Sequence, residues 1–320
     1  MSRALVRTAL GSSSLVAAAL AVALTGCGAA PIGESEEEGV RGDAVAPASF
    51  TLWVHGRVTS SPPAVGDYDD FSYWGPAEGA AGPRPRAVNW GGRERISTSN
   101  AAVRAALDCF CTGDNWCVVA AHSAGDAQIG YALAMFGDTD RPVTDATPDG
   151  AGHCGDSGAR QIGWNVLWVD VAGGAAGGTE LADLGHWAVS DPLTADLRTS
   201  SIRAAYDHGA THGAWVYHFA GASGGAGSAV LPGQDDGVVA YHSAGGLSAP
   251  GRFCNPGDAF CSDSLRLDTA PSHIGKTAVP KWDHHATAVR DDDEALDHYT
   301  RGAWAGIVAP MRDDVATYAN

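Results

Sequence analysis

Residues 118–125 constrain the fold more than any other part of the sequence. The small apolar residues Val-Val-Ala-Ala run directly into His-Ser-Ala-Gly, and the following residues place Ile129, Leu133 and Phe136 on one helical face. A strand, a sharp turn and a helix are therefore predicted in that order. In this context a serine hydroxyl can stand exposed at a sheet edge as a nucleophile, and Ser123 occupies that position. The short string alone is common, so its meaning depends on the rest of the chain.

A second copy of the same tetrapeptide, at residues 242–245, competes for that role. It also follows a Val-Val pair that predicts a strand. The residues after it, 246–251, have the composition of turns rather than of an amphipathic helix. Ser243 would therefore lack the helix N-terminus that can face an oxyanion, and Ser123 is the preferred nucleophile.

The N-terminus predicts export and lipid attachment. Arg3 and Arg7 precede an apolar run at 15–24 that is too short to span a bilayer comfortably. The sequence Leu-Thr-Gly-Cys then resembles a lipobox, in which the peptide is cut before Cys27 and that cysteine carries the lipid. Residues 1–26 are therefore predicted to be a lipoprotein signal peptide, with an ordinary secretory signal as the alternative.

A flexible tether is predicted between the lipid and the folded part. Residues 27–48 are rich in Gly, Ala, Pro and Glu and have no apolar period, so they bury too little surface to fold. Acyl chains on Cys27 would hold the domain at residues 49–320 on a membrane. The expected location is the cell envelope, outside the cytoplasm, at the outer membrane or the cell surface.

The charge of the chain argues against nucleic acid as a partner. The formal net charge is −17, and two further positive charges leave with the signal peptide. Nucleic-acid binding requires a basic surface, which this composition does not supply.

The seven cysteines fit an oxidising compartment. Without Cys27 six remain, which is the even number expected for disulfides. Cys254 and Cys261 enclose a turn-rich loop and are predicted to pair. The spacing of Cys109 and Cys111 is poor for a tetrahedral zinc site, so no metal is predicted. The connectivity of four cysteines stays open: Cys109, Cys111, Cys117 and Cys154.

Strands alternate with helices along the folded part, which predicts an α/β fold with a mostly parallel central sheet and helices on both faces. Strands are predicted at 50–54, 118–121, 165–171, 214–219 and 238–241. Helices are predicted after capping candidates at 97–100, after Ser123, and at 202–206.

In scattered blocks across residues 50–310, the chain resembles the bacterial true lipases of the α/β-hydrolase fold. The blocks are Trp-Val-His-Gly at 53–56, Ala-x-Ser-x-Gly at 121–125, Gly-Gly-Thr-Glu-Leu-Ala-Asp at 177–183, Asp-Asp-Gly-Val-Val at 235–239, and Ser-His-Ile-Gly-Lys at 272–276 followed by Trp-Asp-His at 282–284.

The resemblance implies a catalytic triad of Ser123, Asp236 and His284, with His285 as second choice for the base. Nucleophile, acid and histidine then follow the chain order of α/β hydrolases. Asp235, next to the proposed acid, is the alternative at that position.

The resemblance also implies an oxyanion hole formed by the backbone N–H groups of Arg57 and Ala124. An aspartate that helps to bind calcium in some members of the family is Ala286 here. No cofactor is therefore expected, with calcium as a minor alternative. An insertion at about 244–271 separates blocks that lie close together in the family.

Taken together, the sequence predicts a lipid-anchored serine hydrolase that cleaves carboxylic esters through an acyl-enzyme. Its partners would be an ester or lipid substrate and the membrane that holds the anchor. Two alternatives remain open. One keeps the triad for amides or polyesters, and the other is a non-catalytic surface lipoprotein that uses a degenerate hydrolase fold for binding.

Overall fold

A six-stranded sheet in which every neighbouring pair is parallel lies at the centre of the fold. The computed structural model describes residues 48–59, 63–144, 154–185, 191–221, 223–233, 235–244, 288–290 and 296–319. The strand order is β2-β1-β3-β6-β7-β8. The strands are β1 (Ser49–Val54), β2 (Pro85–Val88), β3 (Trp116–His122), β6 (Val166–Ala172), β7 (Trp215–Phe219) and β8 (Ala288–Arg290). The predicted mostly parallel sheet is confirmed.

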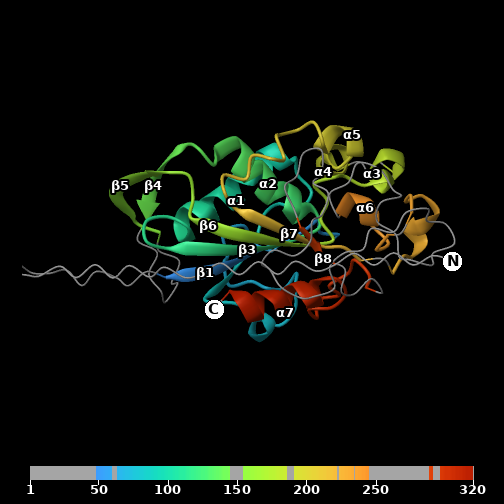
Figure 1. The fold of residues 1–320 in the computed structure, drawn as a ribbon, viewed down its shortest axis with the longest axis horizontal. Coiled ribbons are helices and arrows are strands. Elements are labelled where there is room, and N and C mark those ends of the chain that lie inside the picture. Colours follow the sequence, from blue (N-terminus) through green and yellow to red (C-terminus); the bar gives the residue numbers. More distant parts are fainter. Residues whose placement is uncertain are drawn as a thin grey trace, which may run out of the picture. The chain divides into compact units, whose positions relative to one another are not determined.

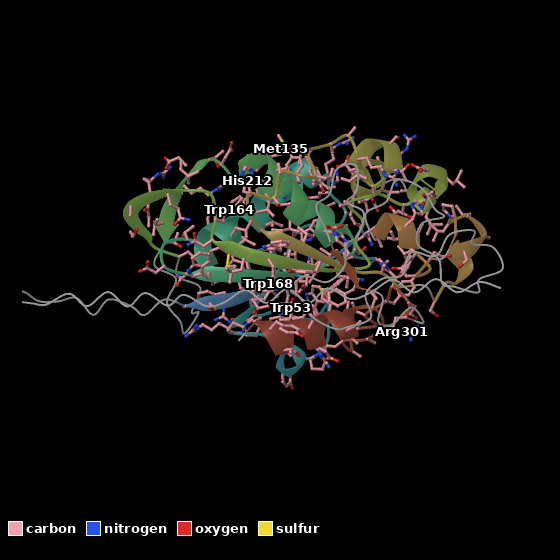
Figure 2. All side chains as sticks on the ribbon, in the orientation of Figure 1. Trp53, Met135, Trp164, Trp168, His212 and Arg301 are labelled. Carbon is pink, nitrogen blue, oxygen red and sulfur yellow. A yellow bond between two sulfur atoms is a disulfide. The ribbon has the colours of Figure 1, made fainter. Side chains whose placement is uncertain are left out.

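Helices cover both faces of this sheet, as Figure 1 shows. On one face α1 (Ile96–Phe110) and α2 (Ala124–Phe136) pack against alternate strand residues such as Leu52 and Val119. On the other face α7 (Val308–Tyr318) packs against Trp53, which lies between the sheet and this helix (Figure 2). Successive strand residues point to opposite faces, so an almost continuously apolar strand is what a sheet covered on both sides requires.

Several shorter helices complete the fold. They are α3 (Glu180–Gly185), α4 (Pro192–Asp196), α5 (Thr199–Ile202), α6 (Tyr241–Ala244), and the 3-10 helices η1 (Ala77–Gly79) and η2 (Ala226–Ala229). A separate antiparallel hairpin joins β4 (Asp140–Thr144) to β5 (Asp156–Ile162). Among the residues that the structure describes, each helix is too short or too polar to cross a bilayer.

The start of α1 differs from the prediction that a residue within 97–100 caps it. The helix already begins at Ile96, and its N-cap residue, Arg95, makes no side-chain capping bond. Instead, Asp196 of α4 accepts a hydrogen bond from the Ile96 N–H at 2.9 Å. A carboxylate distant in sequence therefore satisfies one of the free N–H groups at this helix end.

The strand predicted at 238–241 is wrong. Residues 237–239 form a bend, and Tyr241 begins the short helix α6. The physical reason lies in Asp236, whose Oδ1 accepts hydrogen bonds from the N–H groups of Val238 and Val239 at 3.0 and 2.8 Å. N–H groups held by a side chain in this way are not available to a sheet ladder.

Two disulfides settle the connectivity that the sequence left open. Cys109 pairs with Cys154, and Cys111 pairs with Cys117. The second bond closes the short connection between α1 and β3, the strand that leads to Ser123. Cys254, Cys261 and the predicted lipid-bearing Cys27 lie outside the described residues, so their roles stay predictions.

Candidate active site

A strained turn between β3 and α2 carries Ser123. Its backbone has φ 56° and ψ −124°, a region that residues with a side chain rarely adopt. The turn is held by the Ser123 N–H, which donates to the carbonyl of Ala172, and by the Ser123 carbonyl, which accepts from the N–H groups of Asp126 and Ala175. The predicted strand, sharp turn and helix are therefore present.

Two glycines are required by close approaches around this turn. A Cβ on Gly125 would lie 2.3 Å from the carbonyl oxygen of Val54, at the end of β1. A Cβ on Gly56 would lie 2.6 Å from the Cβ of Ser123 and 2.7 Å from the hydroxyl of Tyr73. The small residue in the Ser-x-Gly pattern thus lets α2 begin directly against the sheet edge.

The duplicate tetrapeptide has a different environment. Ser243 is fully buried in the four-residue helix α6, and its hydroxyl donates to the carbonyl of Gly178 at 2.8 Å. A buried hydroxyl that is committed to a backbone carbonyl is unsuited to attack a substrate. Of the two serines, Ser123 is the one that lines a cavity.

Asp236 and His298 form a closely joined buried pair. Asp236 Oδ2 lies 2.7 Å from His298 Nδ1, and the His298 N–H donates to the carbonyl of Asp236 at 3.0 Å. The other carboxylate oxygen accepts from two backbone N–H groups, so both side-chain oxygens of Asp236 accept hydrogen bonds. A carboxylate only accepts, so His298 Nδ1 carries the proton, and its Nε2 is the free acceptor in the neutral ring.

The sequence prediction missed His298. It placed the base at His284 or His285, and both of these residues lie outside the described part of the chain. His298 follows Asp236 in the same chain order as those residues do, so order alone could not separate the three. The signal in the sequence was weak because Asp-His-Tyr-Thr at 297–300 matches none of the family blocks.

A cavity of about 620 Å³ joins Ser123 to His298. One part of its wall is apolar and includes Leu181, Leu197 and Val238. The cationic side chains of Arg57 and Arg301, the latter labelled in Figure 2, also line the cavity. No aspartate or glutamate is among its described lining residues, although the chain as a whole is strongly acidic.

The two backbone N–H groups predicted to form an oxyanion hole lie close to Ser123. Ala124 begins α2, and Arg57 follows Gly56, which abuts the Ser123 side chain. Within the described residues neither of these N–H groups donates a hydrogen bond. Free N–H groups at a helix start and in a neighbouring loop can stabilise negative charge on an oxygen atom.

His55 and Trp90 fix the loop that carries Gly56. His55 Nδ1 donates to the Gly56 carbonyl at 2.7 Å, and the opposite ring nitrogen accepts from the Trp90 N–H at 3.1 Å. Burial lowers the pKa of His55 to about 4, so the ring stays neutral and keeps both bonds at neutral pH. This agrees with a role for His55 in ordering the loop.

Asp126, in the first turn of α2, is a buried carboxyl group beside the site. Its Oδ2 accepts a hydrogen bond from the Ala176 N–H at 3.0 Å. Burial raises its pKa from 3.8 to about 7, because removing a carboxylate from water disfavours the charged form. The folded chain therefore binds a proton here over a pH range in which the unfolded chain has released it.

This raised pKa predicts a loss of stability as the pH increases from about 4 to about 7, which levels off once Asp126 is ionised in the folded chain as well. Asp126→Asn keeps an oxygen for the Ala176 N–H and removes the titration. We expect the variant to exceed the wild type in free energy of unfolding at pH 8 by roughly 2 to 4 kcal/mol. The difference should vanish near pH 4. Urea unfolding at several pH values measures this, with exposed Asp138→Asn as the matched control. Equal differences at pH 4 and pH 8 would contradict the assignment.

In the part of the chain that the structure covers, no three His, Cys, Asp or Glu side chains are grouped so that they could hold a metal ion. Ala286, which replaces the family's calcium-binding aspartate and argues against calcium, lies outside that part.

Comparisons with known proteins concern the fold. No family model and no curated protein matches the chain. Among solved structures, the mature lipase from Bacillus licheniformis is similar at 14% identity, with 81% of this chain and 89% of that chain covered and a TM-score of 0.43. EstA from Clostridium botulinum is similar at 13% identity, with 88% and 89% covered and a TM-score of 0.49. The Staphylococcus hyicus lipase is similar at 10% identity, with 85% and 95% covered and a TM-score of 0.47.

The architecture is that of the α/β-hydrolase fold. A parallel sheet is covered on both faces, and a serine stands at the turn between β3 and α2. What chemistry the site performs has to be argued from its own residues, because a fold hosts many functions.

Proposed function

We propose that this chain is a serine hydrolase that cleaves carboxylic esters through an acyl-enzyme, with Ser123 as nucleophile, His298 as general base and Asp236 as the acid. One observation carries the proposal. Ser123, on a strained turn, lines the same cavity as His298, and His298 is hydrogen bonded to a buried carboxylate. His298 takes the role that the sequence prediction gave to His284.

In the first half of the reaction, the Ser123 hydroxyl attacks the ester carbonyl. A serine hydroxyl is a weak nucleophile at neutral pH, so His298 Nε2 accepts its proton during attack. Asp236 holds the proton of His298 on Nδ1 and stabilises the imidazolium that forms. The imidazolium then returns the proton to the leaving alcohol, and the acyl group stays on Ser123.

The oxygen of the attacked carbonyl becomes an anion in the tetrahedral intermediate. We assign the N–H groups of Arg57 and Ala124 to receive it, and this is supported by the fact that neither donates a hydrogen bond within the described residues. Preorganised donors of this kind are a large part of acyl-transfer catalysis, because they stabilise charge that exists only near the transition state.

Water completes the cycle. His298 removes a proton from a water molecule, which attacks the acyl-enzyme. The imidazolium then returns this proton to the Ser123 oxygen, so that a carboxylic acid leaves and the Ser123 hydroxyl is restored. The apolar wall with Leu181, Leu197 and Val238 offers a place for an apolar acyl group. An ester with such a group is therefore the proposed substrate class.

The lipoprotein prediction is part of this proposal. A lipid on Cys27 would hold the hydrolase at a membrane surface outside the cytoplasm, near ester-containing lipids. The net charge of −17 is consistent with a partner other than nucleic acid.

A fluorophosphonate probe tests the mechanism directly. Such a probe phosphonylates an activated serine and loses fluoride, so it should label the folded chain on Ser123. Ser123→Ala should abolish the label. Mass spectrometry of the modified peptide identifies the site.

The duplicate tetrapeptide supplies a matched control. Ser243→Ala should keep full labelling, because that hydroxyl is buried against Gly178. A wild-type chain that resists the probe, or a label that survives Ser123→Ala, would refute the mechanism. The first of these results would favour a binding role on the same fold.

A further inference from the structure

A chain of hydrogen bonds runs from Tyr73 through His122 to the backbone of His298. The Tyr73 hydroxyl lies 2.6 Å from His122 Nδ1, and His122 Nε2 lies 2.8 Å from the carbonyl oxygen of His298. The two imidazole rings pack with their centroids 4.6 Å apart. His122 directly precedes Ser123, so this chain of contacts connects the backbones of the proposed nucleophile and base.

The partner atoms fix where the protons are. A carbonyl oxygen only accepts, so His122 Nε2 carries the proton that it donates to His298. Burial, with a smaller effect of the neighbouring His298, holds the pKa of His122 well below its ordinary value. The ring is therefore neutral, its Nδ1 accepts, and the Tyr73 hydroxyl donates. Burial also raises the pKa of Tyr73, so this hydroxyl keeps its proton.

The segment that carries His298 depends on such contacts. Residues 296–300 belong to neither a helix nor a strand, so no regular backbone ladder holds them. Asp236 fixes the His298 N–H and ring, and His122 fixes its carbonyl. In addition, Thr300 Oγ1 donates to the carbonyl of Tyr73 at 3.1 Å. Tyr73 thus holds this segment directly through its backbone carbonyl and indirectly, through His122, with its side chain.

We propose that Tyr73 and His122 are positioning residues for the general base, acting through the carbonyl of His298. This inference rests on the proposed function. Neither residue exchanges a proton with substrate. They fix the backbone at His298 so that its imidazole keeps its place in the cavity that it shares with Ser123. A neutral His122 also does not oppose the positive charge that forms on His298, whereas two cationic rings at this spacing would repel each other.

Three variants separate the parts of this arrangement. Tyr73→Phe removes the hydroxyl donor, and His122→Leu removes both bonds. His122→Gln keeps an amide N–H near the place of Nε2. With p-nitrophenyl butyrate as substrate, we expect Tyr73→Phe and His122→Leu each to lower kcat by about tenfold or more, because small displacements of a reacting group are costly. KM should change by less than about twofold, and His122→Gln should stay within about threefold of the wild type.

The double variant Tyr73→Phe/His122→Leu tests whether Tyr73 acts through His122. Residues that work as one unit are not additive, so the double variant should be no slower than His122→Leu alone. Tyr131→Phe, the same chemical change on α2 away from the cavity, is the matched control and should keep wild-type kcat. Thermal unfolding followed by circular dichroism shows that each variant is folded. If His122→Leu does not fold, Tyr73→Phe and His122→Gln carry the test.

A second readout does not depend on turnover. Long-range ¹H–¹⁵N spectra of the histidine rings distinguish the two neutral tautomers and the charged ring. The signals that disappear in His122→Gln belong to His122. We expect the neutral Nε2–H form between about pH 5.5 and 8, where an ordinary histidine titrates.

Several results would overturn the proposal. The first is that the losses of the two single variants multiply in the double variant, and the second is that His122→Gln is as slow as His122→Leu. The third is a loss of about 10⁴-fold or more in His122→Gln, which would make His122 itself the base. The fourth is a His122 ring that carries its proton on Nδ1, or that titrates, in the spectra. If the wild type neither hydrolyses esters nor reacts with the fluorophosphonate, the proposed function fails. The spectra then decide alone whether the hydrogen-bond chain exists.

Discussion

Replacing His298 by glutamine is expected to lower kcat/KM for an ester by roughly 10⁵- to 10⁶-fold. Without an imidazole at this position, Ser123 has no group to accept its proton, and the leaving alcohol has no group to return one. The residual rate would come from binding and from the oxyanion donors alone. Steady-state hydrolysis of p-nitrophenyl butyrate measures the loss, and circular dichroism checks that the variant is folded.

The same experiment distinguishes the base proposed from the structure, His298, from the two residues predicted from the sequence. His284→Gln and His285→Gln are the matched controls, since they make the same change at the two residues that the sequence favoured. Each should keep activity within about tenfold of the wild type, because neither is assigned a role in proton transfer. A severe loss in His284→Gln combined with an active His298→Gln would return the base to His284 and refute the assignment made from the Asp236 contact.

Asp236→Asn is expected to lower kcat by about 10⁴-fold while leaving the fold intact. Two backbone N–H groups fix the orientation of the new side-chain amide. Its oxygen stays on the N–H groups of Val238 and Val239, which Oδ1 accepts in the wild type. Its NH₂ group then faces His298 Nδ1, where it can only donate. His298 is forced to carry its proton on Nε2, which cannot accept a proton from Ser123 in that form.

Asp235→Asn provides the comparison for that loss. Asp235 Oδ1 accepts from the Ser228 hydroxyl and the Gly237 N–H, and no contact joins it to His298 among the described residues. We expect kcat to change by less than about tenfold. Steady-state rates and thermal midpoints of both variants give the answer. Equal losses in the two variants would show that the turn as a whole matters rather than the Asp236–His298 bond.

The motif that carries the proposed nucleophile could be predicted from the sequence because its signal is local. A strand, a strained turn and a helix leave their pattern within about twenty residues of Ser123, and the close approach of Gly125 to Val54 explains the small residue that marks the turn. The prediction of Asp236 as the acid likewise came from a short block. The parallel sheet followed from the alternation of strands and helices.

The base proposed from the structure could not be predicted in the same way, because its position depends on tertiary contacts. His298 is recognised by its bonds to Asp236, 62 positions earlier, and to His122, 176 positions earlier. Neither hydrogen bond requires a characteristic residue spacing that could be recognised in the sequence. Long-range contacts also explain the misplaced start of α1, where Asp196 takes the capping role, and the strand wrongly predicted at 238–241, where Asp236 takes the N–H groups.

The hydrogen bonds between Asp236 and His298 affect how much the length of the chain between them can change. The two residues hold each other by side chain and by backbone, so their separation does not depend on the length of the intervening sequence. The entropy of closing a loop grows only slowly with length, by about 0.6 kcal/mol for each doubling. Insertions such as the one inferred at about 244–271 can therefore accumulate between the two residues at little thermodynamic cost. The interval between Asp236 and His298 can therefore change in length with little effect on the hydrogen bonds that join the two residues.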